Sequence, residues 1–186
     1  MKIIAGEYKG RHIDMPRGAD IRPTSDKVRE ALFNIMMDKV AGSCVLDLFA
    51  GSGAFGIEAL SRGAGHAVFV DLQKKCADCV RANLRGLAIS KEKYDIYCND
   101  AFKALKKLSD TKIRFNIVFL DPPYHEGLLK KSLIYLCNHD ILYPSSLVIC
   151  EHFKKDEMPD EIDCLVRCRE ARYGDTVLSF YTRRNV

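Results

Sequence analysis

The chain has 186 residues, of which 47% are hydrophobic and 29% are charged. This composition fits one globular domain, or a domain with a small extension, and it excludes an intrinsically disordered protein. The formal net charge of +4 is unevenly spread, because residues 1–29 and 167–186 are basic while residues 30–166 are slightly acidic. Basic ends around a catalytic core would suit contact with a polyanion, although an ordinary solvated surface explains the charges at least as well.

The longest apolar stretches, residues 44–50 and 115–120, are too short to cross a bilayer, and no secretory signal is expected at the start. We therefore expect a cytoplasmic protein whose eight cysteines are thiols. Two pairs have spacings that zinc sites use, Cys76 with Cys79 and Cys164 with Cys168. Their helical and strand-like settings favour ordinary cysteines, and we expect no metal. The others are expected to be small core residues: Cys44, Cys98, Cys137 and Cys150.

In chain order, residues 2–14 carry short apolar spells around glycines, which predicts a hairpin-like extension, and Pro16 to Pro23 is expected to be a loop. Thr24 or Ser25 then caps a helix, with Asp26 in the first turn. The sequence thus divides into an extension, residues 1–40, and a catalytic domain, residues 41–186.

From residue 44 the pattern alternates between strand and helix. Strands are predicted at 44–49, 67–71, 94–98, 115–120 and 146–151, and helices near 54–62, 74–86, 101–108 and 127–138. Such alternation predicts an α/β fold with a Rossmann-like, mostly parallel sheet. Two successive strands at 162–169 and 176–182 predict a C-terminal antiparallel hairpin.

A glycine-rich turn follows the first predicted strand of this fold. Gly51, Gly53 and Gly56 satisfy the GxGxxG spacing of dinucleotide-binding proteins. Asp47 lies near the end of the preceding strand, where a carboxylate would repel a pyrophosphate and would suit the ammonium of a methionine group instead. The alternative is that Asp47 is a structural cap on the turn.

Two further acids end the next predicted strands. Asp71 lies 20 residues after Gly51, where doubly wound folds place an acid that accepts ribose hydroxyls. Asp100, beside Asn99, could accept from an adenine amino group, and helix capping explains it equally well.

The segment Asp121-Pro-Pro-Tyr124 follows the predicted strand 115–120, at the sheet edge where open α/β folds bind ligands. A carboxylate, a rigid backbone carbonyl and an aromatic ring within four residues suit a planar ring that bears an amino group. The ring would stack on Tyr124, and the amine would donate to Asp121 and to the Pro122 carbonyl. Holding both hydrogens aims the nitrogen lone pair, so catalysis would rest on positioning and electrostatics.

With these two motifs the chain resembles the RsmD-type 16S ribosomal RNA (guanine-N(2))-methyltransferases, which are class I S-adenosylmethionine-dependent enzymes of bacteria. The resemblance covers nearly the whole chain. It includes the segments Arg22-Pro-Thr24, Val28-Arg-Glu-Ala-Leu-Phe-Asn34, Glu58-Ala-Leu-Ser-Arg-Gly-Ala64 and Tyr173-Gly-Asp-Thr176. Asp71 is a small departure, because the family often has Glu there, and either acid can hold a ribose.

The resemblance implies transfer of a methyl group from S-adenosylmethionine to N2 of a guanine in 16S ribosomal RNA, within the small subunit or its assembly intermediate. Implied cofactor residues are Asp47, Phe49, Gly51, Gly53, Asp71, Leu72, Asp100 and Ala101. Implied catalytic residues are Asp121, Pro122 and Tyr124. Implied substrate-binding residues are Lys9, Arg11, Arg22, Thr24, Arg29 and Pro123, which makes residues 1–40 a substrate-binding extension.

Two other functions share parts of this pattern. A DNA adenine methyltransferase, or another nucleobase amino methyltransferase, would use the same Asp-Pro-Pro-Tyr chemistry. A sequence-specific DNA enzyme usually adds a recognition module, for which 186 residues leave little room. A NAD-binding Rossmann protein would explain the glycines, but Asp47 and the Asp121 motif argue against it.

Overall fold

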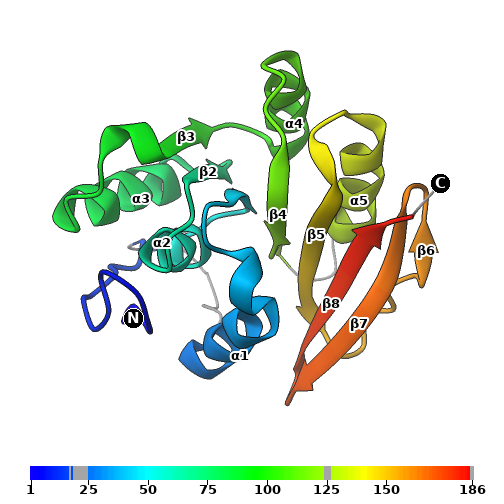
Figure 1. Cartoon of the computed structure of the whole chain (residues 1–186), viewed down its shortest axis with the longest axis horizontal. Coiled ribbons are helices and arrows are strands. Elements are labelled where there is room, and N and C mark those ends of the chain that lie inside the picture. Colours follow the sequence, from blue (N-terminus) through cyan, green and yellow to red (C-terminus); the bar gives the residue numbers. More distant parts are fainter. Residues whose placement is uncertain (17, 19–24, 124–126, 185–186) are drawn as a thin grey trace. The chain divides into compact units, whose positions relative to one another are not determined.

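A computed structural model describes residues 1–16, 18, 25–123 and 127–184 (Figure 1). The chain divides into two compact units, Met1–Ala101 and Phe102–Val186. Residues 1–40 belong to the first unit together with residues 41–101. The predicted boundary between a substrate-binding extension, residues 1–40, and a catalytic domain, residues 41–186, therefore stays a prediction about function. Within the described ranges, no helix is long and apolar enough to span a membrane.

Three parallel strands, in the order β3-β2-β1, form the centre of the first unit. They are β1 (Cys44–Leu48), β2 (His66–Asp71) and β3 (Tyr94–Cys98). Leu46 lies opposite Val68, and both side chains are fully buried. In β1 and β2 four consecutive residues are buried, which is typical of parallel strands that are covered on both faces.

The helical elements of this unit are α1 (Asp26–Met36), η1 (Met37–Lys39), α2 (Ala54–Ser61), α3 (Lys74–Gly86) and η2 (Lys91–Lys93). The hydroxyl oxygen of Ser25 accepts a hydrogen bond from the Val28 N–H at 3.2 Å, which confirms the predicted cap of α1. Helices α2 and α3 pack against β2. Their contacts fix the turns that connect β1 and β2 to the helices that follow.

The second unit has five strands in the order β4-β5-β8-β7-β6. They are β4 (Phe115–Leu120), β5 (Leu142–Phe153), β6 (Glu161–Ile162), β7 (Leu165–Tyr173) and β8 (Thr176–Arg183). Strands β4 and β5 are parallel, and the remaining pairs are antiparallel. Helix α5 (Leu128–Asn138) connects β4 to β5, and α4 (Ala101–Asp110) precedes β4 (Figure 1).

The predicted fold class is confirmed by these elements, including the antiparallel hairpin of β7 and β8. Strand β5 begins four residues before its prediction, at Leu142, which pairs with Phe115 before the register shifts. The first predicted C-terminal strand is split, because Asp163 has a φ of +47° and turns the chain between β6 and β7. A turn of that kind is not visible as a change in hydrophobic pattern.

The cysteines differ from the expectation of eight thiols, because Cys137 and Cys164 form a disulfide with a Cα–Cα distance of 5.6 Å. The last turn of α5 brings Cys137 to the segment before β7, a contact that spacing along the chain does not reveal. Cys98 is exposed, so its predicted place in the core is wrong, whereas Cys76 and Cys150 are buried. Among the described residues, no group of three metal-ligating side chains comes together.

Candidate active site

The turn after β1 is held open by left-handed backbone at three positions. Phe49, Gly51 and Gly53 have φ angles of +74°, +55° and +77°. The N–H groups of Phe49 and Ala50 both donate to the carbonyl of Val70 at 2.9 Å, which fastens the turn to the end of β2. The turn therefore runs along the carboxyl end of the strands, where α/β folds bind ligands.

The third glycine of the motif serves helix packing rather than the turn. A Cβ atom added to Gly56 would lie 2.3 Å from Cε1 of Phe69 on β2. Only a residue without a side chain lets α2 approach β2 this closely. The GxGxxG spacing therefore has two separate causes. Gly51 and Gly53 form the tight turn, and Gly56 allows the close contact between α2 and β2.

Asp47 is 2% exposed, and its Oδ2 accepts a hydrogen bond from the Gly56 N–H at 3.0 Å. This contact is the structural cap that the sequence left open as an alternative. Burial raises the pKa of Asp47 to about 8; the Gly56 N–H opposes the shift and the negative charge of Asp71 adds to it. A contribution of Asp47 to cofactor binding stays a prediction.

The raised pKa of Asp47 predicts a pH-dependent contribution to stability. The folded pKa of about 8 exceeds the ordinary value of 3.8, so the folded state favours the neutral carboxyl, and Asp47 lowers stability as pH rises through that window. Relative to wild type, Asp47→Asn should therefore gain unfolding free energy from pH 5 to pH 8, by at most about 4 kcal/mol. Urea titrations across this range test it, and a constant difference between the two proteins would contradict it.

Asp71 connects the glycine turn to the segment after β2. Its Oδ2 accepts from the Gly51 N–H at 2.9 Å, and its Oδ1 accepts from the Gln73 N–H at 2.8 Å. Leu72 follows it with 69% of its surface exposed, a large apolar side chain beside a carboxylate. Asp100 is half-buried, and Ala101, at the start of α4, is buried. All eight implied cofactor residues thus belong to the first unit.

Asn83 was missed by the sequence analysis and joins two parts of this unit. Its Nδ2 donates to the carbonyls of Asp14 and Ser52, both at 3.0 Å, and its Oδ1 accepts from the Asp14 N–H at 2.8 Å. The amide therefore fastens the N-terminal segment to the glycine turn. The available signal was a polar residue on the apolar face of α3, three residues after the buried Val80.

The N-terminal segment is also anchored on α2, through a second residue that the sequence analysis missed. Glu58 is fully buried and accepts from the N–H groups of Ile4 and Ala5 at 2.8 and 3.0 Å. Arg62 donates to Glu58 at 2.7 Å, and the guanidinium of Arg29 lies 3.7 Å from it. A buried charge network of Glu58, Arg62 and Arg29 therefore holds the N-terminal segment within the first unit.

This network corrects one predicted substrate contact. Arg29 is 1% exposed and also bonds to Asp26 at 3.1 Å, so its charge is used inside the protein and not on an RNA phosphate. Arg11 donates to the carbonyls of Gly86 and Leu87 at the end of α3, and Lys9 is exposed. Arg22 and Thr24 lie outside the described residues.

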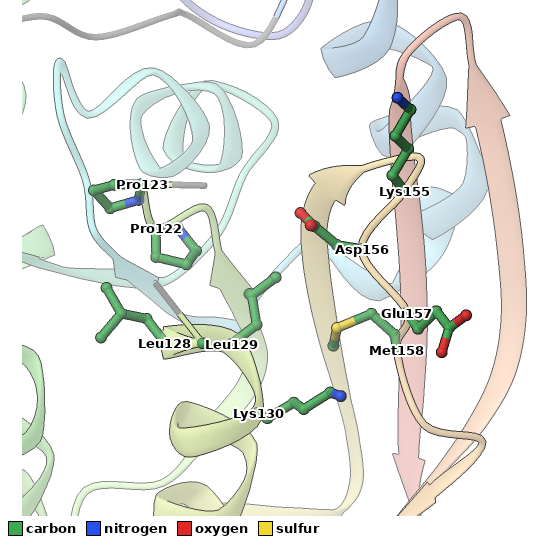
Figure 2. Close-up of a pocket in the computed structure, with 10 residues that line it drawn as sticks. Pro122, Pro123, Leu128, Leu129, Lys130, Lys155, Asp156, Glu157 and Met158 are labelled. Carbon is green, nitrogen blue, oxygen red and sulfur yellow. The ribbon is translucent and has the colours of Figure 1, made fainter. Parts of the chain in front are cut away.

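In the second unit, β4 leads directly into the Asp121 motif. Asp121 is half-buried, Pro122 is buried and Pro123 is exposed, while Tyr124 lies outside the described residues. Both prolines line a pocket of about 490 Å³, together with the start of α5 and the segment 155–158 after β5 (Figure 2). This volume is ample for one nucleobase and lies in the usual range of ligand pockets.

The alternating strands and helices, the glycine turn and the Asp-Pro-Pro segment after β4 define a protein with the class I methyltransferase fold. The chain matches the family described as conserved hypothetical protein 95 over residues 1–182 and belongs to it, which confirms the RsmD-type resemblance.

Individual relatives cover most of the chain. A Bacillus subtilis protein, YlbH, is 40% identical over 99% of this chain and 100% of its own length. The ribosomal RNA small subunit methyltransferase D of Haemophilus influenzae is 38% identical over 81% of this chain and 78% of its own. The solved structure of yhhF from Escherichia coli has a TM-score of 0.85 and 31% identity, covering 100% of this chain and 99% of that one.

Proposed function

We propose that this protein transfers a methyl group from S-adenosylmethionine to N2 of a guanine in 16S ribosomal RNA. The observation that carries the proposal is the Asp121-Pro-Pro segment after β4, whose two prolines line a pocket with ample room for a nucleobase. Relatives that are 33–38% identical are named ribosomal RNA small subunit methyltransferase D, which supports RNA as the substrate. The substrate would be the small subunit or its assembly intermediate, in the bacterial cytoplasm.

The residues of the first unit fit S-adenosylmethionine better than a dinucleotide. Asp47 and Asp71 are close enough for the charge of Asp71 to raise the pKa of Asp47. The charge of Asp71 would repel a pyrophosphate, and a pyrophosphate would further disfavour the ionisation of Asp47. The ammonium and sulfonium of S-adenosylmethionine would instead favour the charged form of Asp47 and would be attracted by both acids. Asp47 and the glycine turn would hold the methionine part, and Asp71 the ribose. Leu72 with Asp100 and Ala101 would hold the adenine. When bound, the cofactor supplies the electrophilic methyl group.

In the second unit, Asp121 and the Pro122 carbonyl would accept the two hydrogens of the guanine amine. An exocyclic amine is a poor nucleophile because its lone pair is delocalised into the ring. Two acceptors that hold both hydrogens localise this pair and direct it, which lowers the barrier by positioning and electrostatics. Pro122 and Pro123 fix the backbone of the segment and carry no N–H that would compete for Asp121. Tyr124 would stack on the base.

Residues 1–40 would contribute the RNA contact outside the reacting base. The exposed Lys9 is a candidate for a phosphate contact, because phosphate contacts supply most of the sequence-independent affinity for RNA. Arg11 would contribute less, since its guanidinium already bonds to two carbonyls at the end of α3.

The direct test incubates purified protein with small ribosomal subunits, or their RNA, and S-adenosylmethionine that carries a labelled methyl group. Digestion to nucleosides and mass spectrometry should find the label in N2-methylguanosine. Label in N6-methyladenosine, or only in DNA offered in parallel, would overturn the proposal.

The cofactor assignment predicts that Asp71→Ala weakens S-adenosylhomocysteine binding by about 1–3 kcal/mol, the usual worth of hydrogen bonds to a charged group. Asp71→Asn should lose less, because its amide oxygen can still accept from the Gly51 N–H. Asp95→Asn, an exposed change in the same unit, is the control. Isothermal titration calorimetry measures the affinities, and equal affinity for wild type and Asp71→Ala would remove Asp71 from the cofactor site.

A further inference from the structure

Two lysines line the pocket beside the Asp121 motif, and they come from two different elements. Lys130 lies in the first turn of α5, and Lys155 lies in the segment after β5. Both side chains are exposed. In the view of Figure 2 their ammonium groups lie toward opposite ends, with Asp156 and Met158 between them. The pocket that would hold the reacting base therefore has a cation on each of two walls.

Each of these lysines has a lysine neighbour in the chain whose charge is used within the protein. Lys131 lies 4.0 Å from the centre of an aromatic ring on α4, and Lys154 forms an ion pair at 2.8 Å. In the part of the chain that the structure describes, the ammonium groups of Lys130 and Lys155 form no ion pair and no hydrogen bond. Each pair of adjacent lysines thus contains one that stabilises the fold and one whose charge is available beside the pocket.

The backbone that carries the two pocket lysines is held in place. The N–H groups on either side of Lys155 both donate to backbone carbonyls at 2.9 Å. Lys130 is followed on α5 by the buried Leu133, and this helix packs against β5. Asp156 and Glu157 also line the pocket, so the two lysines would act as individual contacts and not as a basic surface.

The proposed reaction offers these two cations a ligand. Enzymes that modify a base take it from a single strand or turn it out of the helix, so the base enters the pocket while its backbone stays at the mouth. Every internal nucleotide of RNA has one phosphate on its 5′ side and one on its 3′ side. Lys binds phosphate as a point charge, and such contacts position a nucleic acid without reading its sequence.

We propose that Lys130 and Lys155 each bind one of the two phosphates that flank the target guanosine, and so position the base against the Asp121 motif. This inference rests on the proposed guanine-N2 activity. It adds to the RNA contact of residues 1–40 a second contact, made at the reacting nucleotide itself. The two lysines would act in substrate binding, whereas the Asp121 motif would act on the amine.

The salt dependence of the reaction is the first readout. Activity on small-subunit RNA is measured as kcat/KM at several salt concentrations, and its logarithm is plotted against the logarithm of the salt concentration. Each lost contact to a single-stranded phosphate should reduce the magnitude of the slope by about 0.7. We expect this reduction for Lys130→Gln and for Lys155→Gln, and about twice as much for the double variant. The matched controls Lys131→Gln and Lys154→Gln remove the same charge from the neighbouring residue and should keep the wild-type slope.

Neutral linkages then identify the phosphate that each lysine binds. After the methylated position is mapped with wild type, splinted ligation places a methylphosphonate on its 5′ or its 3′ side, next to a 2′-deoxyribose that keeps the linkage stable. Each RNA is compared with one that has the same deoxyribose and an ordinary phosphate. Wild type should lose about 10-fold in kcat/KM with either neutral linkage, the worth of a hydrogen bond to a charged group. Each lysine variant should be insensitive to one linkage and keep the wild-type sensitivity to the other.

Lysine variants that keep the wild-type slope, or that remain as sensitive as wild type to both neutral linkages, would overturn the assignment while leaving the guanine-N2 activity in place. An equal loss of slope in Lys131→Gln and Lys154→Gln would overturn it as well, because the effect would then come from net charge. Wild type that methylates no guanine in small-subunit RNA would overturn the proposed function, and this inference with it.

Discussion

Asp121→Ala is expected to lower kcat by about 10²- to 10³-fold, while the affinity for S-adenosylhomocysteine stays within a few-fold of wild type. Asp121 would act on the amine in the reacting arrangement, and losing one preorganised electrostatic contact of this kind has an effect of that size. Asp121→Asn should lie between the two proteins, because an amide oxygen can accept one hydrogen but carries no charge.

Single-turnover assays with labelled S-adenosylmethionine measure the rate, and calorimetry measures cofactor binding. The exposed Asp140→Asn in the same unit is the control for a change of charge. Turnover of Asp121→Ala near the wild-type rate would remove this residue from the mechanism.

Glu58→Ala should lower the unfolding free energy by about 3–5 kcal/mol, the usual result of breaking a buried ion pair from one side. The substitution removes the Glu58 carboxylate that lies 3.7 Å from the buried Arg29 guanidinium. It also removes the acceptor for the N–H groups of Ile4 and Ala5. In the matched control Asp78→Asn, an exposed pair with Arg81 is lost, at a cost of about 1 kcal/mol or less.

Chemical denaturation measures both variants, and hydrogen exchange of the N–H groups of residues 3–13 shows where the loss occurs. We expect faster exchange in that segment for Glu58→Ala alone. Equal stability of Glu58→Ala and wild type would mean that the network around Glu58 contributes nothing to holding the N-terminal segment.

The sequence predicted the order of strands and helices in this protein because each element has its own periodic pattern. Helix α3 begins and ends where its pattern predicts, at Lys74 and Gly86, and Ser25 caps α1 as expected. The turn at Asp163 and the early start of β5 were missed, since they depend on pairing between strands and not on local composition.

For the site, local motifs were informative and tertiary contacts were not. The glycine turn and the Asp121 motif are contiguous segments that follow strands, so their place at the strand ends could be predicted. Arg29 was assigned to RNA because its charge is visible in the sequence, whereas its buried partner Glu58 lies 29 positions further along. Asn83 and the Cys137–Cys164 disulfide were missed for the same reason.

Deleting the gene in its own bacterium and analysing 16S ribosomal RNA nucleosides by mass spectrometry tests the proposed reaction most directly. Loss of one N2-methylguanosine, restored by the wild-type gene and not by Asp121→Ala, is the predicted result. An unchanged amount of N2-methylguanosine in the deleted strain would contradict it, whether or not another modification is lost.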